Sequence, residues 1–156
     1  MTAPERFSPL PDEADVFRLV IEGHKVFMPP GVALPLPAWL EPNDEDVAAA
    51  TKRNRPPGLS VWDCARTRVS DAARIRWGAE PPAGVRGFAW RAGRVREIGR
   101  NANRHVDVVT HPRDAADGAG ADGHALIEGL KRPDVVPRPL HRQLLTDLAR
   151  ASRPFP

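Results

Sequence analysis

The apolar residues of this chain fall in short runs that are bounded by Gly, Pro, Asn or Asp. The runs are rich in Val, Ile, Leu and aromatic residues, and several of them alternate apolar with polar positions. This pattern is typical of short strands in an antiparallel sheet. It predicts strands at 59–62, 104–111 and 124–130. It also predicts a hairpin from Val85 to Ile98, where "VRGFAWRAGRVREIG" alternates on both sides of Ala92 and Gly93.

The stretch "ADVFRLVIEGHKVFMPP", residues 14–30, fits two structures. A capped helix could begin within Asp12 to Asp15 and end at Gly23. The β-branched and aromatic content of "VFRLVI", with a second apolar stretch "KVFM" after it, favours a hairpin instead. We therefore expect a strand at 16–21.

Three segments have helical signals. In "NDEDVAAATKRN", Asn43 is a suitable N-cap, acids fill the first turn and bases the last. A second helix is expected at 66–78, capped by Thr67 or Ser70 and ended by Gly78. The clearest helix is "PLHRQLLTDLARAS" at the C-terminus, with Pro139 in its first turn. Its apolar stripe consists of Leu140, Leu144, Leu145 and Leu148.

These elements predict an α+β fold, a mainly antiparallel sheet of short hairpin-linked strands with two short helices and a C-terminal amphipathic helix, the helices covering one face. The chain of 156 residues is long enough for one domain, predicted at 13–156 after a loose lead-in at 1–12. Its 18 Pro and 12 Gly predict proline-rich irregular segments. The segment 29–42 is expected to lie extended over the core, with Trp39 and Leu40 tucked in.

The compartment is predicted from what the sequence lacks. The single cysteine, Cys64, cannot form an internal disulfide, and it is more simply a small buried residue than a nucleophile. The N-terminal residues have no apolar run of signal-peptide length, and no run approaches a membrane span. We expect a cytoplasmic bacterial protein with no membrane contact.

Charge is distributed unevenly along the chain. Residues 1–50 carry nine acids against three bases, a net of −6, whereas residues 66–104 carry ten arginines against three acids, a net of +7. Such asymmetry can mark a nucleic-acid face, or it can make two halves of one domain attract each other.

Histidines and acids gather near the middle of the chain. In a strand at 104–111, His105, Asp107 and His111 lie on one face, and His124 begins the next strand. A cluster of His105, Asp107 and His124 would suit a hydrolase or group transferase, with or without a metal ion. The alternative is that these residues decorate the solvated face of a sheet, and we favour it because no established ligand spacing is present.

No cofactor is expected. The Asp-rich loop "RDAADGAGADG" lacks the spacing of a calcium loop, and no glycine-rich phosphate-binding junction is found.

The predicted hairpin is the best argument for nucleic-acid binding. Its arginines alternate with Phe88 and Trp90, so a ribbon could offer phosphate contacts beside stacking rings. The same alternation could place the rings in the core and leave the arginines solvated or paired with the acidic N-terminal third. The binding residues under this hypothesis are Arg86, Trp90, Arg91, Arg94, Arg96 and Arg100.

The leading functional hypothesis is a small accessory module that acts through protein–protein contacts. No catalytic or cofactor motif is specific, whereas the segregated charge indicates contact surfaces. Trp39, on a proline-flanked segment, is a candidate anchor for another protein. Enzyme and nucleic-acid-binding protein remain the alternatives.

Overall fold

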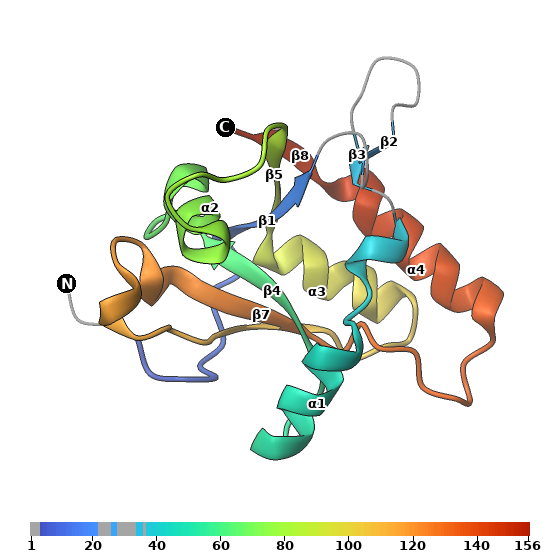
Figure 1. Cartoon of the computed structure of the whole chain (residues 1–156). Coiled ribbons are helices and arrows are strands. Elements are labelled where there is room, and N and C mark those ends of the chain that lie inside the picture. The colour runs from blue at the N-terminus through green and yellow to red at the C-terminus, as the bar shows by residue number, and fades with distance from the viewer. Residues whose placement is uncertain (1–3, 22–25, 28–33, 36) are drawn as a thin grey trace.

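The computed structural model describes residues 4–21, 26–27, 34–35 and 37–156. Its centre is a six-stranded antiparallel sheet in the order β6-β7-β4-β1-β5-β8, and a separate two-stranded pair is formed by β2 and β3 (Figure 1). Among the described residues, no helix is long and apolar enough to cross a membrane. The strands are β1 (Asp15–Ile21), β2 (Val26–Phe27), β3 (Leu34–Pro35), β4 (Gly58–Asp63), β5 (Val85–Arg91), β6 (Asp107–Thr110), β7 (His124–Glu128) and β8 (Arg153–Phe155).

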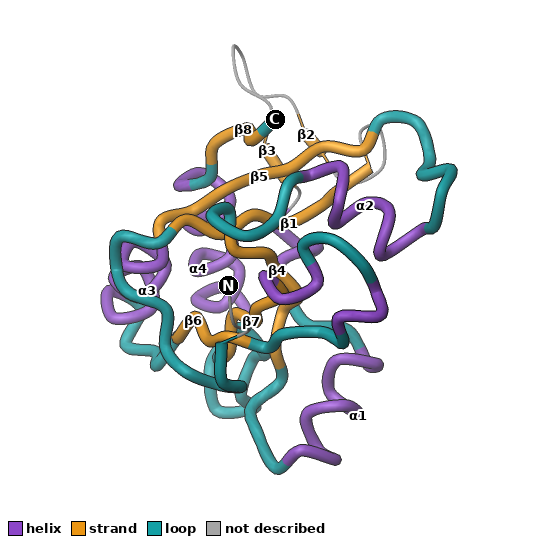
Figure 2. The backbone as a smooth tube through the Cα atoms, turned by 90° about the vertical axis from the view of Figure 1, so that its left-hand side faces the viewer, coloured by secondary structure: helices purple, strands orange, loops and turns teal. Residues whose placement is uncertain are grey.

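Four α-helices cover both faces of the sheet. They are α1 (Asp44–Arg53), α2 (Val69–Trp77), α3 (Ala92–Asn101) and α4 (Arg138–Ala151). The main core lies between the sheet and α3 with α4, where Phe88 and Trp90 of β5 are fully buried. A smaller core around Phe17 and Trp62 lies under α2 on the opposite face. Figure 2 shows α3 and α2 on opposite sides of the strands.

The predicted α+β class with a mainly antiparallel sheet is confirmed, but two features of the arrangement differ. Helices cover both faces, since α2 packs on the face opposite α3 and α4. Most strands are joined through helices and not through hairpins. In the described part of the six-stranded sheet, β6 and β7 alone are neighbours both in the chain and in space. β1 pairs with β4 and β5, whereas β2 pairs with β3.

The predicted hairpin from Val85 to Ile98 is wrong in its second half. β5 ends at Arg91, and the chain continues directly into α3. In "RVREI" the apolar residues Val95 and Ile98 are three positions apart, a helical spacing that breaks the alternation of a strand. Val95, Ile98 and Gly99 are buried on one face of α3. Gly93 lets the helix start lie close to the lead-in, because a Cβ there would stand 2.8 Å from that of Asp12.

The other three helices form where capping residues and apolar stripes predict them, with differences in single residues. The Asn43 side chain accepts a hydrogen bond from the Asp46 backbone N–H at 2.8 Å, so the predicted cap of α1 is confirmed. The cap of α2 is Arg68 instead of Thr67 or Ser70, because the Thr67 hydroxyl donates to the Gly120 carbonyl. In α4, Leu144, Leu145 and Leu148 are buried, whereas Leu140 is 63% exposed.

The proline-rich segment is described only at 34–35 and from 37 onward, so Pro29 and Pro30 lie outside the described residues. A 3-10 turn at Pro37–Leu40 packs against α4, with Leu40 fully buried and Trp39 42% exposed.

The lead-in packs against the edge of the sheet. The Leu10 N–H donates to the Val108 carbonyl, and Pro9 forms an isolated bridge with Val109 of β6. Arg96 of α3 fixes this segment: its guanidinium donates to the carboxylates of Asp12 at 2.7 Å and Asp107 at 2.8 Å, and to the Leu10 carbonyl. At this point the arginine-rich segment does pair with the acidic N-terminal third.

These contacts make Arg96 a stabilising residue, since its side chain is only 15% exposed. Replacement by Leu leaves the Asp107 carboxylate without its cationic partner. We expect Arg96→Leu to lower the free energy of unfolding by about 2–4 kcal/mol, measured by urea unfolding. Arg100→Leu, at an exposed position one turn further along α3, is the matched control, with an expected change within about 0.5 kcal/mol. Equal effects of the two substitutions would contradict this role of Arg96.

Candidate functional site

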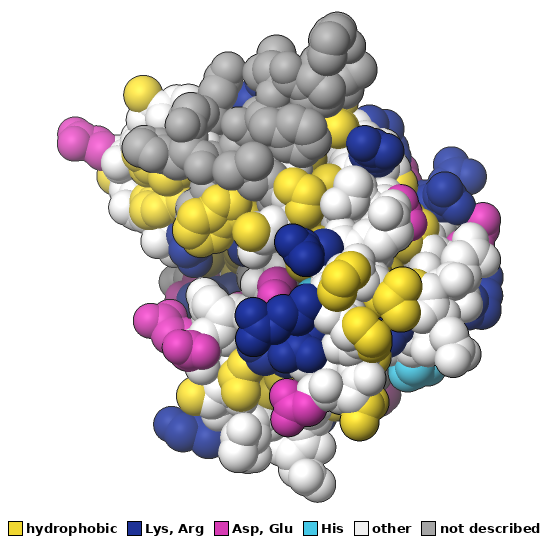
Figure 3. Space-filling view, turned by 90° about the vertical axis from the view of Figure 1, so that its right-hand side faces the viewer, with side chains coloured by type: hydrophobic (Ala, Val, Ile, Leu, Met, Phe, Trp, Pro, Cys, Tyr) yellow, Lys and Arg dark blue, Asp and Glu magenta, His cyan; other side chains and the backbone are white. Residues whose placement is uncertain are grey.

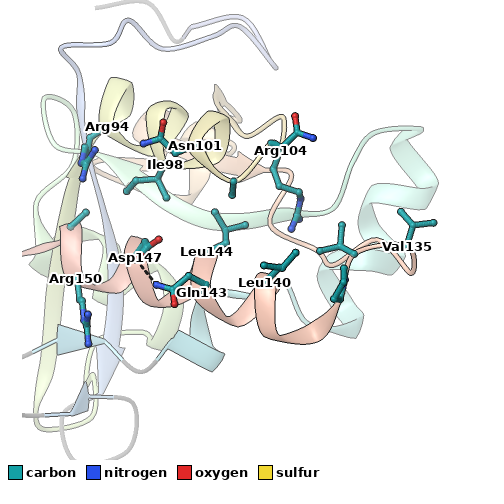
Figure 4. Close-up of a pocket in the computed structure, with 15 residues that line it drawn as sticks. Arg94, Ile98, Asn101, Arg104, Val135, Leu140, Gln143, Leu144, Asp147 and Arg150 are labelled. Carbon is teal, nitrogen blue, oxygen red and sulfur yellow. Dashed lines mark hydrogen bonds between the residues drawn. The ribbon is translucent and has the colours of Figure 1, made fainter.

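A groove of about 670 Å³ runs between α3, α4 and the loop that leads into α4 (Figure 4). This α3–α4 groove has an apolar floor, where Ile98 of α3 and Leu144 of α4 point toward one another. At one end its rim carries two large apolar side chains, Leu140 at 63% and Val135 at 89% exposure. The groove therefore continues the protein core outward to solvent.

The sequence of α4 explains why the apolar stripe reaches the surface. Leu144, Leu145 and Leu148 are buried against the rest of the protein. Leu140 belongs to the same stripe but lies in the first turn of α4, where it is exposed. The preceding loop brings Val135 to the same rim. Large apolar side chains exposed together on a charged rim are a feature of interaction surfaces.

The groove is positively charged at its edges. Arg94, Arg104 and Arg150 line it against one acid, Asp147, which accepts a hydrogen bond from Gln143 at 2.8 Å. Arg94 shares an exposed ion pair with Glu97, a contact that is weak in water. Arg150 is exposed and makes no ion pair with any described residue. Figure 3, seen from the α4 side, shows basic and apolar side chains intermixed on this face.

Arg104 connects the groove to the main body of the protein. Its guanidinium donates to the Gly129 carbonyl at 2.8 Å and to the Lys131 carbonyl at 3.1 Å, and it lies 3.2 Å from Nδ1 of His141. These contacts therefore fix the edge of the groove near Arg104.

The structure does not bring together the predicted trio of His105, Asp107 and His124. His105 is exposed before β6, and Asp107 begins β6, where it binds Arg96. The register pairs Asp107 with Glu128, so His124 lies four residues away along β7, roughly 13 Å at strand spacing. Among the described residues no three His, Cys, Asp or Glu side chains are placed to hold a metal ion.

A different pair is formed instead, between His111 and His124. The two Nδ1 atoms are 3.1 Å apart, and Nδ1 of His124 lies 2.8 Å from the His111 carbonyl oxygen. His124 is 7% exposed, so this end of the sheet face is not the solvated surface that alternation predicted. The pKa of both imidazoles is lowered to about 4, and burial is the largest cause.

Ser60 is the member of this cluster that sequence reasoning missed. Its Oγ lies 2.6 Å from Nε2 of His124, because Ser60 and His124 occupy neighbouring strands on one face. A carbonyl only accepts hydrogen bonds, so Nδ1 of His124 carries the proton and Nε2 accepts one from the Ser60 hydroxyl. A serine inside the apolar run "GLSVW" was the available signal, but the register of β4 and β7 was needed to interpret it.

The arginines and tryptophans of the nucleic-acid hypothesis are dispersed. Trp90 is fully buried, and its indole N–H donates to the Leu148 carbonyl at 2.7 Å. Arg96 is committed to structural contacts. The remaining predicted residues are Arg86 and Arg91 on β5 and Arg94 and Arg100 on α3, so they are not neighbours on one ribbon.

The thiol of the single cysteine has low reactivity in this environment. Cys64 is half-buried, and burial together with nearby carboxylates raises the pKa of its thiol to about 12. The reactive thiolate is therefore scarce at neutral pH.

Comparison with known proteins gives no match: no family model, no curated protein and no solved structure is significantly similar to the chain.

The buried histidine pair makes stability depend on pH. The pKa of His124 falls from 6.5 to about 4 on folding, so the unfolded state binds more protons between these values. Stability is therefore lost as the pH decreases from about 6.5 to about 4, by about 3 kcal/mol for His124 alone. Urea unfolding over this range should show the loss, and His124→Gln should reduce it. His105→Gln, at an exposed position, should keep the wild-type pH dependence; a reduction there as large as in His124→Gln would refute this assignment.

Proposed function

We propose that this chain is an accessory module of the bacterial cytoplasm that binds another protein through the α3–α4 groove. The occupant we infer is an acidic amphipathic helix of the partner. The observation that carries this proposal is the joint exposure of Val135 and Leu140 on the rim of an apolar groove lined by three arginines and one acid.

The shape of the groove supports a helical occupant. An amphipathic helix docks by placing apolar side chains, spaced three or four residues apart, into a groove between two elements. Ile98 and Leu144 form an apolar floor, and Leu140 and Val135 extend it along the α4 side. A partner helix would cover the two exposed side chains and so remove apolar surface from water.

Charge supports an acidic partner over a basic one. Arg94, Arg104 and Arg150 line the groove, and their positive charge favours carboxylates on the polar side of the docked helix. Charge of this kind accelerates association and selects among partners more than it adds affinity. Binding is therefore expected to weaken as salt concentration increases.

The alternative functions have less support. Stacking on nucleic-acid bases requires exposed rings, whereas Phe88 and Trp90 are fully buried. An enzyme built on His105, Asp107 and His124 requires those side chains to meet, and the β6–β7 register separates Asp107 from His124. Trp39 remains a candidate contact, although it does not line the groove.

Selection from a phage-displayed random peptide library tests the groove directly. We expect the enriched peptides to combine several Asp or Glu with apolar residues three and four positions apart, and to bind in the micromolar range by fluorescence anisotropy. Leu140→Glu, at a 63% exposed position, should weaken binding at least about tenfold by placing a charge on the apolar rim.

The matched control is Ala48→Glu, which adds the same charge at an exposed position of α1. It should bind the selected peptides like the wild type. Basic or charge-neutral enriched peptides, peptides that bind the Leu140→Glu variant as tightly, or a library that yields no binder would each contradict the proposal.

A further inference from the structure

A second cavity lies on the α2 side of the sheet, away from the α3–α4 groove. β1 pairs with β4 only at Val16 and Phe17, and beyond these residues the two strands separate. The side chain of Arg18 extends toward β4 here and donates from Nη1 to the Ser60 carbonyl at 2.9 Å. The resulting Arg18 cleft measures about 210 Å³, below the range of pockets for drug-sized ligands and suited to a small ion.

Arg18 has an unused donor inside the protein. Its Nε is buried and has no hydrogen-bond acceptor among the described residues. A buried donor of this kind is costly unless something accepts from it. Burial is also the main reason why the pKa of Arg18 is lowered to about 10, with Asp46 opposing the shift and Arg76 adding to it. An anion in the cleft would stabilise the charge of the guanidinium, although the buried Nε itself lies out of its reach.

Two further arginines line the same cleft. Arg76 at the end of α2 is exposed and lies over the Trp77 ring, 5.3 Å from its centroid. Arg113 comes from the loop after β6 and binds Asp117 through Nε, which leaves its other guanidinium nitrogens for a ligand. Guanidinium groups are suited to phosphate and carboxylate oxygens.

One acid, Asp46, is among the described lining residues, and its negative charge offsets only one of the three guanidinium charges. Its Oδ2 accepts from the Asn43 N–H at 2.9 Å in the capping box of α1. With three guanidinium groups against one carboxylate, the lining of the cleft is net positive.

Ser60 adds a selective element to the cleft. Its hydroxyl proton is directed to Nε2 of His124, so the lone pairs of Oγ remain for a ligand. A lone pair facing the cleft repels a bare anionic oxygen but accepts a hydrogen bond from a P–OH group. The cleft thus combines donors for anionic oxygens with one acceptor for a hydrogen.

We propose that the Arg18 cleft binds a hydrogen-bearing phosphate group, with Arg18 and Arg76 donating to its anionic oxygens and Ser60 accepting its hydrogen. Arg113, from the loop after β6, is the third arginine that lines the site. The ligand is either inorganic phosphate, which keeps at least one P–OH near neutral pH, or a small phosphate monoester in its singly protonated form, which is populated below the second pKa of about 6. This site is independent of the proposed protein-binding groove.

Sulfate is the discriminating probe, because it has the shape of phosphate but carries no hydrogen near neutral pH. Isothermal titration calorimetry should show phosphate binding about tenfold or more tightly than sulfate, as one hydrogen bond between a charged and a neutral group allows. Methyl phosphate, titrated at about pH 5 so that it keeps a P–OH hydrogen, separates the two sources: binding like that of inorganic phosphate indicates a monoester site, and its exclusion indicates a site for the free ion.

Two variants test the assigned contacts. Ser60→Ala should weaken phosphate binding and strengthen sulfate binding, because the repulsive lone pair is removed, so that the two ions bind alike; circular dichroism is the check on folding. Arg76→Gln, at an exposed position that does not threaten the fold, should weaken both ions by about tenfold. Arg100→Gln, an equal loss of charge on α3, should leave both unchanged.

Three results would overturn the proposal. They are the absence of phosphate binding to the wild type, sulfate binding as tight as that of phosphate, and equal effects of Arg76→Gln and Arg100→Gln.

Discussion

The burial of Trp90 is the interaction on which the rest of the structure depends. Its indole lies fully buried on β5, an interior strand next to the edge strand β8, and its N–H donates to the Leu148 carbonyl of α4. A buried indole needs such a partner, so β5 and α4 are fixed to one another by both packing and a hydrogen bond. α3 begins directly after β5, which places the two helices side by side and creates the groove between them.

Arginine has three different roles in this molecule, and the number of arginines reveals none of them. Arg96 is structural and joins the lead-in to α3 and β6. Arg150 is exposed at a groove whose apolar floor a partner would cover. Arg18 lies between two strands with a buried Nε. Only the local packing distinguishes a guanidinium that stabilises the fold from one that is available to a ligand.

Sequence patterns predicted those features that depend on neighbouring residues. The Asn43 cap of α1, the stripe of α4 and the positions of β1, β4, β6 and β7 follow from local periodicity and capping chemistry. α3 was missed because the alternation of β5 was extended past Ala92 and Gly93, although the three-residue spacing of Val95 and Ile98, both buried in α3, is helical. The pairing of Ser60 with His124, and the separation of β1 from β4 at Arg18, depend on register across strands distant in sequence. No local pattern encodes such distances.

The two outer strands of the sheet limit how a partner can approach. β8 is three residues long with Pro154 at its centre, and at the opposite border Pro9 bridges to Val109 of β6. Proline lacks the N–H that a neighbouring chain would need, so both borders resist the addition of a foreign strand by main-chain pairing. Under the proposed protein-binding function, recognition therefore depends on side chains of the helices and loops, where a single substitution can alter specificity without disturbing the sheet.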